Sequence, residues 1–327
     1  AQSTASSADE AEVSRLAALS TLDYGKVRKV AADKLGVPVS FLDASVRGKQ
    51  KERAAKDDGQ GTTITFEEIV PAYEPVDGED LADRLTHLFT RFAVLPDHGA
   101  IVLTLWVLFS YCLDLFQIAP RLDLSSPEKR CGKTTVLSLL RRIAFHAVLA
   151  SGITPSVIFR VIAAHKPTLL IDEMDTFIEA NEELRGILNS GHTRDAAMLI
   201  RCQGDNHEPK CFSTWACYAF AHIGPIPDTL EDRSIRLPMR RKLPHECVAS
   251  LRQTGPAARA LHDELRTLMG QIVRWVEDHS PAIAAAHPSP IEGLSDRAND
   301  NWMPLLSIAD ALGGTWPDQA RTAAKTL

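Results

Sequence analysis

One segment of the chain, residues 122–140, constrains the fold more than any other. It reads LDLSSPEKRCGKTTVLSLL, so an apolar run leads into a polar loop, and the loop leads into Gly-Lys-Thr-Thr and a second apolar run with helical spacing. A strand, a loop and a helix in this order place backbone N–H groups at a helix N-terminus, where they bind phosphate oxygens. The segment therefore predicts a phosphate-binding loop in an α/β domain, in preference to an ordinary helix start.

The phosphate-binding loop gives each of its residues an expected role. Lys133 is expected to reach the β- and γ-phosphates of ATP, and the Thr134 hydroxyl is expected to bind Mg²⁺. The common pattern begins with Gly, whereas this chain has Pro127, which fixes φ and has no N–H, so that end of the loop must be built differently. The residues predicted to contact the nucleotide are Pro127, Glu128, Lys129, Arg130, Cys131, Gly132, Lys133, Thr134 and Thr135.

A second segment, PTLLIDE at residues 167–173, reads as a short buried strand that ends in two acids. Asp172 is expected to hold Mg²⁺ through water, and Glu173 to polarise the water that attacks the γ-phosphate. The alternative is a strand end with two solvated acids. Small-molecule kinases and GTPases with a phosphate-binding loop generally lack the second acid, so the pair favours an ATPase that hydrolyses its nucleotide.

A third segment, AFAHIGPIPDTLEDRSIR at residues 219–236, combines a strand with a turn rich in charge. His222 ends the strand, where ring ATPases place a polar residue that senses the γ-phosphate. Arg233 is the candidate for an arginine finger that completes the site of a neighbouring subunit. The alternatives are a salt bridge of Arg233 with Asp232 or Glu231, and Arg236 as the finger.

Residues 197–215 predict a β-hairpin just ahead of the strand that ends at His222, because two extended runs flank a turn sequence, Gln-Gly-Asp-Asn. Such a hairpin grips nucleic acid in ring helicases, and a structural or regulatory hairpin is equally compatible with the sequence. Its turn is acidic at Asp205 and Glu208, with basic residues Arg201, His207 and Lys210 beside it.

The C-terminal region offers one further basic candidate, Arg297. A basic residue in the helical lid of a ring ATPase commonly touches the γ-phosphate, so Arg297 is a candidate for nucleotide binding. A salt bridge to Asp296 or Asp300 that caps a helix is the alternative.

Short apolar runs alternate with helical segments from residue 121 onward, which predicts an α/β domain with a parallel sheet. The expected organisation is a polar lead-in and small helical unit at 1–56, a linker at 57–80, a helical segment packed on the core at 81–120, the core at 121–245 and a C-terminal helical domain at 246–327. The apolar stretch at 100–113 is shorter than the roughly 20 residues that cross a bilayer, so it predicts a buried helix and no membrane contact.

The net charge limits how the chain could contact nucleic acid, and the cysteine content indicates its redox compartment. The formal net charge of -6 excludes a basic footprint over the whole chain, so any nucleic-acid contact must come from local patches. The basic run between Arg47 and Lys56 is one such patch, or else a solvated helix end. Six cysteines are too few for a disulfide framework, and Cys131 lies within the phosphate-binding loop, so we expect a reducing, cytoplasmic location.

These motifs together resemble an ATPase domain of bacteria, phages and integrated elements that is often encoded with, or fused to, primase-type modules. The motifs are SPEKRCGKTT, LLIDEMDTF, LRGILNSGHTR, FSTWACYAFAHIG, PDTLEDRSI and DRANDNWMPLLSIAD, and they cover about residues 80–327. The segment LDYGKVRKVAADKLGVPVSFLD resembles a small helical unit that often precedes such ATPases in replication proteins.

The resemblance implies an AAA+-like core with an N-terminal helical unit and a C-terminal helical lid. It also implies a homo-oligomeric ring, with a hexamer favoured, and single-stranded DNA or a primase as partner. The function expected from residues and resemblance together is a Mg²⁺-dependent ATPase that acts as a helicase or translocase in replication of a phage or mobile element. The alternative is a nucleotide-switched assembly or scaffold ATPase, for instance in phage defence, without motor activity.

Overall fold

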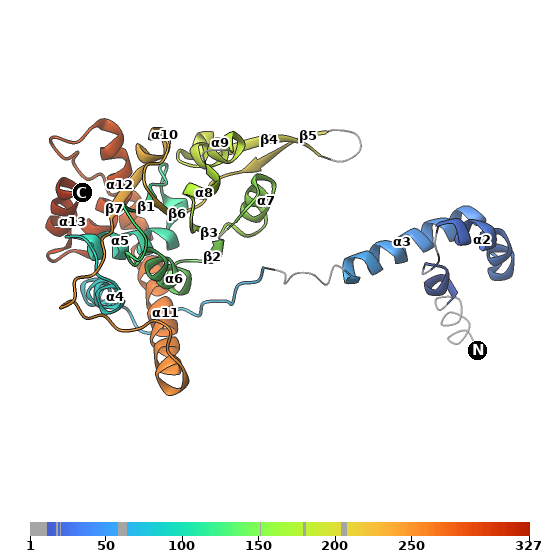
Figure 1. Ribbon diagram of the computed structural model, residues 1–327, viewed down its shortest axis with the longest axis horizontal. Helices are drawn as coiled ribbons and strands as arrows, with labels where there is room; N and C mark the ends of the chain where they lie inside the picture. The colour runs from blue at the N-terminus through green and yellow to red at the C-terminus, as the bar shows by residue number, and fades with distance from the viewer. Residues whose placement is uncertain are drawn as a thin grey trace. The chain divides into compact units, whose positions relative to one another are not determined.

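The computed structural model describes residues 12–17, 19, 21–57, 64–150, 152–178, 181–203 and 208–327. The chain divides into two compact units, residues 1–66 and residues 67–327, each with a hydrophobic cluster of its own. The first unit is helical and the second contains both helices and strands (Figure 1).

The first unit consists of a helical turn at 12–16 followed by α2 (Thr21–Leu35) and α3 (Val39–Asp57). Helix α2 ends because Gly36 takes the left-handed conformation, with φ at 67°, which glycine adopts at little cost. The Val37 N–H then reaches back to the Ala32 carbonyl at 3.1 Å, so the last turn is closed and the chain reverses. Among the described side chains of the unit, the buried hydrophobic ones are Leu16, Ala17, Ala31, Ala32, Leu42 and Val46.

A parallel sheet of five strands forms the centre of the second unit. Its strands are β1 (Arg121–Ser126), β2 (Ala147–Ala150), β3 (Thr168–Ile171), β6 (Tyr218–Ile223) and β7 (Ser234–Pro238), in the spatial order β2-β3-β6-β1-β7. Helix α6 (Lys133–Ile143) connects β1 to β2, and α7 (Pro155–His165) connects β2 to β3. The predicted α/β class with a parallel sheet is therefore confirmed.

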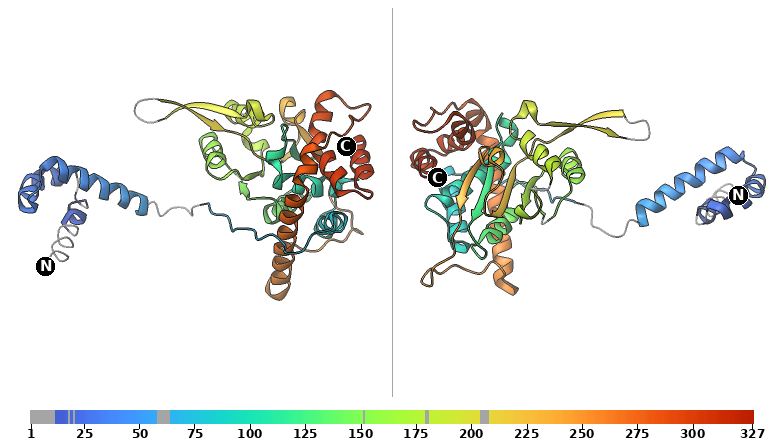
Figure 2. Two further views of the ribbon diagram at one scale, coloured as in Figure 1. Left: turned by 180° about the vertical axis from the view of Figure 1, so that it is seen from behind. Right: turned by 45° about the horizontal axis from the view of Figure 1, so that its top comes forward.

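A two-stranded antiparallel hairpin interrupts the chain between β3 and β6. Its strands are β4 (Met198–Gln203) and β5 (Glu208–Ser213), and Figure 2 shows it projecting from the body of the second unit. This hairpin confirms the one expected at 197–215. Of the residues named in and beside its turn, Asp205 and His207 lie outside the described residues. The short helices α8 (Asp175–Ile178) and α9 (Glu182–Ser190) precede it, and α10 (Asp228–Glu231) joins β6 to β7.

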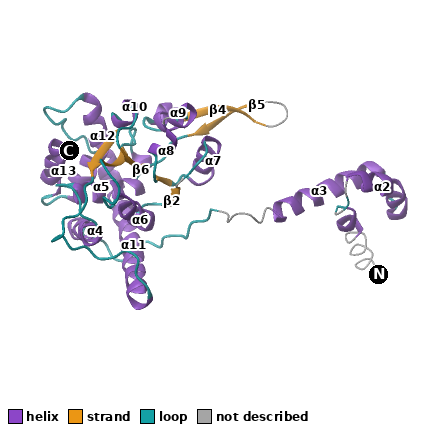
Figure 3. Cartoon of the chain, viewed as in Figure 1, coloured by secondary structure: helices purple, strands orange, loops and turns teal. Residues whose placement is uncertain are grey.

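Five longer helices complete the second unit (Figure 3). They are α4 (Gly78–Phe92), α5 (Gly99–Tyr111), α11 (Gly255–Ala285), α12 (Asp296–Leu312) and α13 (Trp316–Thr326). Helices from both ends of this unit share one hydrophobic cluster with β1, β6 and α6. None of the helices in the described ranges combines the length and apolar character needed to cross a bilayer.

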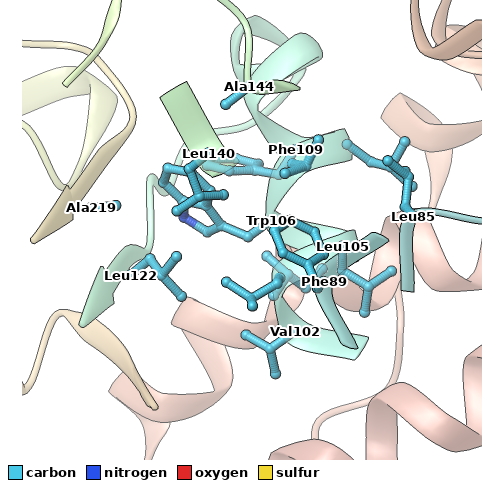
Figure 4. Close-up of a cluster of buried hydrophobic side chains, with 14 of the residues drawn as sticks. Leu85, Phe89, Val102, Leu105, Trp106, Phe109, Leu122, Leu140, Ala144 and Ala219 are labelled. Carbon is cyan, nitrogen blue, oxygen red and sulfur yellow. The ribbon is translucent and has the colours of Figure 1, made fainter. Parts of the chain in front are cut away.

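Helix α5 lies at the centre of this cluster, which explains why the sequence is apolar on every side of it. Trp106 is fully buried, and its indole N–H donates to the Pro120 carbonyl at 3.1 Å, so the helix is held against the start of β1. Figure 4 shows Trp106 among Phe89, Phe109 and Leu122. The predicted buried helix at 100–113 is confirmed, and β1 is thereby fixed at the middle of the core.

Candidate nucleotide-binding site

The loop between β1 and α6 leads into a helix start with no side-chain cap, which is a geometry suited to an anion. Gly132 precedes the helix with φ at 84°. Because glycine has no side chain that could accept a hydrogen bond, the first turn of α6 has no side-chain cap. The first N–H groups of a helix have no intrahelical partner, so those of Lys133, Thr134 and Thr135 face outward at the positive end of the helix dipole. Arg130 also takes a positive φ, 68°, which is uncommon for a residue with a side chain.

Lys133 is folded back against the end of β1. Its side chain is buried, and the ammonium donates to the Ser126 hydroxyl, which in turn donates to the Glu128 carbonyl at 2.7 Å. The Ser126 side chain thus closes the turn at the position where proline cannot donate an N–H. This arrangement accounts for how a loop with Pro127 in its first position is held.

Arg241 supports the same loop from the segment after β7. Its guanidinium donates to the Lys129 carbonyl at 3.0 Å and pairs with the Glu128 carboxylate at 2.7 Å. Both side chains of this pair are about half exposed, so the pair contributes little free energy and mainly orients the loop. Glu128 and Lys129 therefore serve the shape of the loop in this structure.

A cavity of about 350 Å³ opens beside the loop and the start of α6. Of the residues predicted to bind the nucleotide, Arg130, Cys131, Gly132, Lys133, Thr134 and Thr135 line it, whereas Pro127, Glu128, Lys129 and Arg297 do not. The lining also includes six residues that the sequence analysis missed: Phe92, Ala93, Val94, Arg240, Lys242 and Val248. Its volume lies in the range of small-molecule sites.

The missed residues divide into an apolar wall and a basic rim. Residues 92–94 follow the end of α4 and bring apolar surface to the cavity, while Arg240 and Lys242 bring positive charge. The run Arg-Arg-Lys at 240–242, directly after an apolar strand, was the available sequence signal. The Arg240 guanidinium contacts both carboxylate oxygens of Glu246, and with the Leu243 N–H it lowers the pKa of Glu246 to about 2. Nothing in the sequence indicated the wall of residues 92–94.

The predicted acid pair lies at the same edge of the sheet as the loop. Asp172 and Glu173 directly follow β3, and parallel strands end at a common edge. Since one strand, β6, separates β3 from β1, the backbone at Asp172 lies about 10 Å from the end of β1. The Asp172 carboxylate accepts from the Glu173 N–H at 3.0 Å, and Glu173 is exposed with φ at 54°. The structure thus brings both acids toward the loop.

His222 makes two contacts that leave neither ring nitrogen free. Nδ1 lies 2.8 Å from the Gly224 carbonyl oxygen, and Nε2 lies 2.6 Å from Oδ1 of Asp123 on β1. Both ring nitrogens are thus in contact with oxygen acceptors of the protein, one on the loop after β6 and one on β1. Contact with a phosphate would require one of these bonds to open.

Arg233 and Arg297 lie away from the loop of their own chain. The Arg233 carbonyl accepts from the N–H of Arg121, the first residue of β1, so Arg233 is roughly 17 Å along the strand from the loop. Its guanidinium donates to the Thr229 carbonyl at 2.6 Å, and no ion pair with Asp232 or Glu231 is found within the described ranges. Glu231 pairs instead with Arg236, which also approaches Asp123.

Arg297 sits in the first turn of α12, next to Ser295, whose hydroxyl oxygen accepts from the Ala298 N–H and caps the helix. One turn further on, the Asn301 side chain donates to the Asp232 carbonyl at 3.0 Å, which ties α12 to the segment that carries Arg233. Arg233 and Arg297 therefore belong to one edge of the sheet, and the loop and acid pair belong to the other. A single copy of the chain does not bring these predicted residues together.

Arg121 adds a third cation at this edge. It is fully buried, its guanidinium carbon lies 5.7 Å from the centre of the Tyr218 ring, and its three side-chain nitrogens have no hydrogen-bond partner among the described residues. Burial, opposed by Tyr218 and aided by repulsion from Arg233, lowers the pKa of Arg121 to about 9. Within the described part of the chain, the buried Arg121 guanidinium therefore has no carboxylate partner.

The cations at this edge influence the pKa of the buried His192, which lies close to them. Burial lowers its pKa to about 4, and Arg121, Arg233 and Arg297 act in the same direction, against the opposing effect of the Asn301 hydrogen bond. Because the unfolded chain binds a proton near pH 6.5 and the folded chain does not, the stability that neutral His192 contributes is present above pH 6.5 and is lost as the pH falls toward 4.

We expect the free energy of unfolding of wild type to be about 2 kcal/mol lower at pH 5 than at pH 8 because of His192. Urea unfolding of wild type and His192→Gln at both pH values measures the difference, and an equal loss in the two proteins would assign the effect to other groups.

Part of the chain is similar in sequence to known proteins. Residues 238–327 match a family described as "Protein of unknown function (DUF3631)". A protein of Saccharopolyspora erythraea, "Uncharacterized 28.9 kDa protein in xis 5'region", is 39% identical over 90 residues, which are 27% of this chain and 31% of that protein. The chain thus spans about a third of the curated relative it matches.

Two solved structures are similar in part. One is described as the A form apo structure of NrS-1 C terminal region, with 13% identity and a TM-score of 0.38 over 72% of this chain and 50% of that one. The other is a full-length MCM homologue from Methanopyrus kandleri, with 12% identity and a TM-score of 0.46 over 79% of this chain and 62% of that one. The chain covers less than two thirds of either.

Proposed function

We propose that this chain is a Mg²⁺-dependent ATPase with an AAA+-like core, and that it works as a homo-oligomeric ring, a hexamer, on nucleic acid. Its task is that of a helicase or translocase in the cytoplasm, in replication of a phage or mobile element. The observation that carries the proposal is the cavity at the start of α6, which has Lys133 in its wall and the Asp172–Glu173 pair at the same edge of the sheet.

The cavity suits a nucleoside triphosphate. The uncapped N–H groups of α6 and the cations Arg130, Lys133, Arg240 and Lys242 suit the phosphates, and the apolar residues 92–94 suit the base. Lys133, now bonded to Ser126, is free to exchange this hydroxyl for a phosphate oxygen, because an ionic acceptor is the stronger partner.

The oxygen donors suit Mg²⁺, which prefers a few protein oxygens and keeps several waters. The exposed Thr134 hydroxyl and the Asp172 carboxylate would hold it, and the ion would neutralise phosphate charge. Glu173 is the exposed carboxylate next to this position, and it would accept the proton of the attacking water. The buried His222–Asp123 pair holds β6 to β1 between these two groups and keeps the edge in register.

The positions of Arg233 and Arg297 support the proposed ring. Both lie at the edge of the sheet opposite the loop, so they cannot serve the site of their own chain. In a ring, a neighbouring subunit can place its own loop and acid pair beside them. The name of the Saccharopolyspora erythraea relative, which places that protein in the 5′ region of xis, supports the proposed setting in a mobile element.

The second candidate is a nucleotide-switched scaffold without motor activity. Its support is charge: removing the nine basic and four acidic residues of 21–56 from the chain's 36 and 42 leaves 27 basic against 38 acidic residues. An acidic body does not favour movement along a phosphate backbone. Stimulation of ATP turnover by single-stranded DNA separates the two functions, because the motor requires it and the scaffold does not.

Glu173→Gln provides the matched variant for this test. We expect wild type to hydrolyse ATP with Mg²⁺, to stop when the ion is chelated, and to turn over faster when single-stranded DNA is added. Gln keeps the shape of Glu and loses its basicity, so the variant should bind ATP with wild-type affinity and hydrolyse it about 10²–10⁴-fold more slowly.

Steady-state phosphate release and nucleotide titration measure the two quantities separately. Weaker binding in Glu173→Gln with an unchanged rate per bound nucleotide would make Glu173 a structural acid or a metal ligand. Turnover that ignores single-stranded DNA would select the scaffold, and absence of any turnover in wild type would overturn the ATPase.

A further inference from the structure

The first unit contains a helix–turn–helix that the proposed ATPase does not use. Helices α2 and α3 are joined by three residues, Gly36, Val37 and Pro38. Besides the turn at Gly36, the Pro38 carbonyl accepts from the N–H groups of Phe41 and Leu42, at 3.0 and 3.1 Å, and starts α3. A three-residue connection with a left-handed glycine is typical of the helix–turn–helix.

The packing of the two helices leaves one face of α3 exposed. Ala32 of α2 is fully buried, and Leu42 and Val46 of α3 are 1% exposed, so small and branched side chains fill the space between the helices. The opposite face of α3 presents Ser40, Phe41, Ala44, Arg47 and Gly48, all of them exposed. Phe41 has 62% of its surface exposed, an unusual position for a large aromatic side chain in a unit with so small a core.

The charge of the same segment favours a polyanion as partner. Residues 21–56 hold nine Lys and Arg against four Asp and Glu, within a chain whose formal net charge is -6. Asp43 does not weaken the exposed face of α3, because its carboxylate is turned toward α2, where it accepts from Tyr24 at 2.7 Å and from Arg28 at 3.0 Å. Lys26, Lys29 and Lys34 add exposed positive charge on α2.

We infer that this helix–turn–helix binds duplex DNA, with α3 in the major groove. The inference is independent of the ATPase. The first residues of a recognition helix meet the base edges, and here they are Ser40, Phe41 and Ala44. A hydroxyl can pair with any base edge, while Phe and Ala contact the thymine methyl group. Arg47, one turn further along the same face, contacts guanine or a phosphate, and the basic residues of α2 contact the backbone.

A protein partner is the competing occupant of the exposed Phe41. The excess of basic residues around it argues for DNA, because the cores of protein interfaces are depleted of lysine. A groove of duplex DNA also accepts a single helix of this kind, whereas an exposed Phe alone would offer a protein partner little apolar area.

The test is fluorescence anisotropy with the full chain, a labelled duplex of 20 base pairs and no nucleotide present. We expect binding in the range of about 10⁻⁴–10⁻⁶ M near physiological salt, weakening steeply as salt rises. Arg47→Ala should reduce the salt slope by about one. Phe41→Ala should weaken binding without changing that slope, because it removes no charge. Ala44→Glu should abolish binding, since it puts a negative charge at the centre of the exposed face.

Arg15→Ala is the matched control, because Arg15 is an exposed basic residue of the same unit that lies outside both helices and is held by Glu12 at 2.7 Å. It should bind like wild type. Circular dichroism confirms that each variant folds, and Ala44→Glu is expected to pass since Glu is a good helix former at an exposed position. Wild-type affinity in both Ala44→Glu and Phe41→Ala overturns the inference, and so does equal affinity for a single strand of the same length. Because the DNA-binding experiment contains no nucleotide, a negative result in it does not bear on the proposed ATPase. A negative result in the ATP-turnover experiment likewise does not bear on DNA binding by α3.

Discussion

Replacing Arg233 with Ala should lower the kcat for ATP by about 10³–10⁵-fold and leave ATP affinity and folding nearly unchanged. An arginine finger stabilises the charge of the transferring phosphoryl group only when a neighbouring subunit docks, so its loss affects the rate and not binding to the isolated chain. The side chain is half-buried and bonded only to the Thr229 carbonyl in the described ranges, so its removal should cost little stability.

If Arg233 acts on the site of a neighbouring subunit, two inactive variants should complement each other. Mixing Arg233→Ala with Glu173→Gln should restore some turnover, because a mixed interface can join an intact Glu173 of one subunit to an intact Arg233 of the next. Specific activity should also rise with protein concentration in the range where the ring assembles. Phosphate release from the separate and mixed variants, over a dilution series, measures both effects.

Arg236→Ala is the comparison variant for this experiment, since its side chain pairs with Glu231 and approaches Asp123 within its own chain. It should affect stability more than assembly-dependent turnover. Specific activity that stays flat down to the monomer, together with a mixture that stays inactive, would remove the cross-subunit role of Arg233 and with it the main support for a ring.

Lys133→Ala should abolish ATP turnover and weaken ATP binding by about 10–100-fold, the worth of a hydrogen bond to a charged group. Lys133 is a buried cation at the floor of the loop, and its side chain bonds to the Ser126 hydroxyl within the described residues, so removing it loses little native structure. Isothermal titration and phosphate release measure binding and turnover.

Lys129→Ala is the matched control for Lys133, because Lys129 is a lysine of the same loop whose side chain is exposed and does not line the cavity. Its loss should change ATP affinity much less. Wild-type turnover in folded Lys133→Ala would contradict the assignment of the loop as a phosphate site, and equal losses in both variants would show that net charge matters and not position.

Local sequence patterns were sufficient to predict the sheet class, the hairpin and the strand–loop–helix segment that carries the proposed phosphate-binding loop. Each of these depends on neighbours in sequence: the apolar runs of β1, β3 and β6, the turn between β4 and β5, and the glycine before α6. The helix at 100–113 was equally clear, since an apolar segment too short to cross a membrane must be buried in the protein.

The sequence could not indicate contacts between distant segments. The apolar wall at 92–94 meets the loop only because α4 packs on the core beside α6, and the pairing of His222 with Asp123 depends on the register of β6 with β1. The role of His222 as a sensor of the γ-phosphate stays a prediction, and in the structure both of its ring nitrogens contact protein oxygens.

Local sequence was enough to name the candidate residues for phosphate and Mg²⁺, because the loop and the helix N-terminus lie within a few residues of each other. The division of charge between the two edges of the sheet depends on the tertiary structure. Arg121, Arg233 and Arg297 come from β1, the turn before β7 and α12, and they gather at one edge because parallel strands begin there and the Asn301–Asp232 bond holds α12 against it. The loop and the acid pair lie at the other edge because the same strands end there, and the direction of a strand in a sheet is set by long-range pairing and not by local sequence.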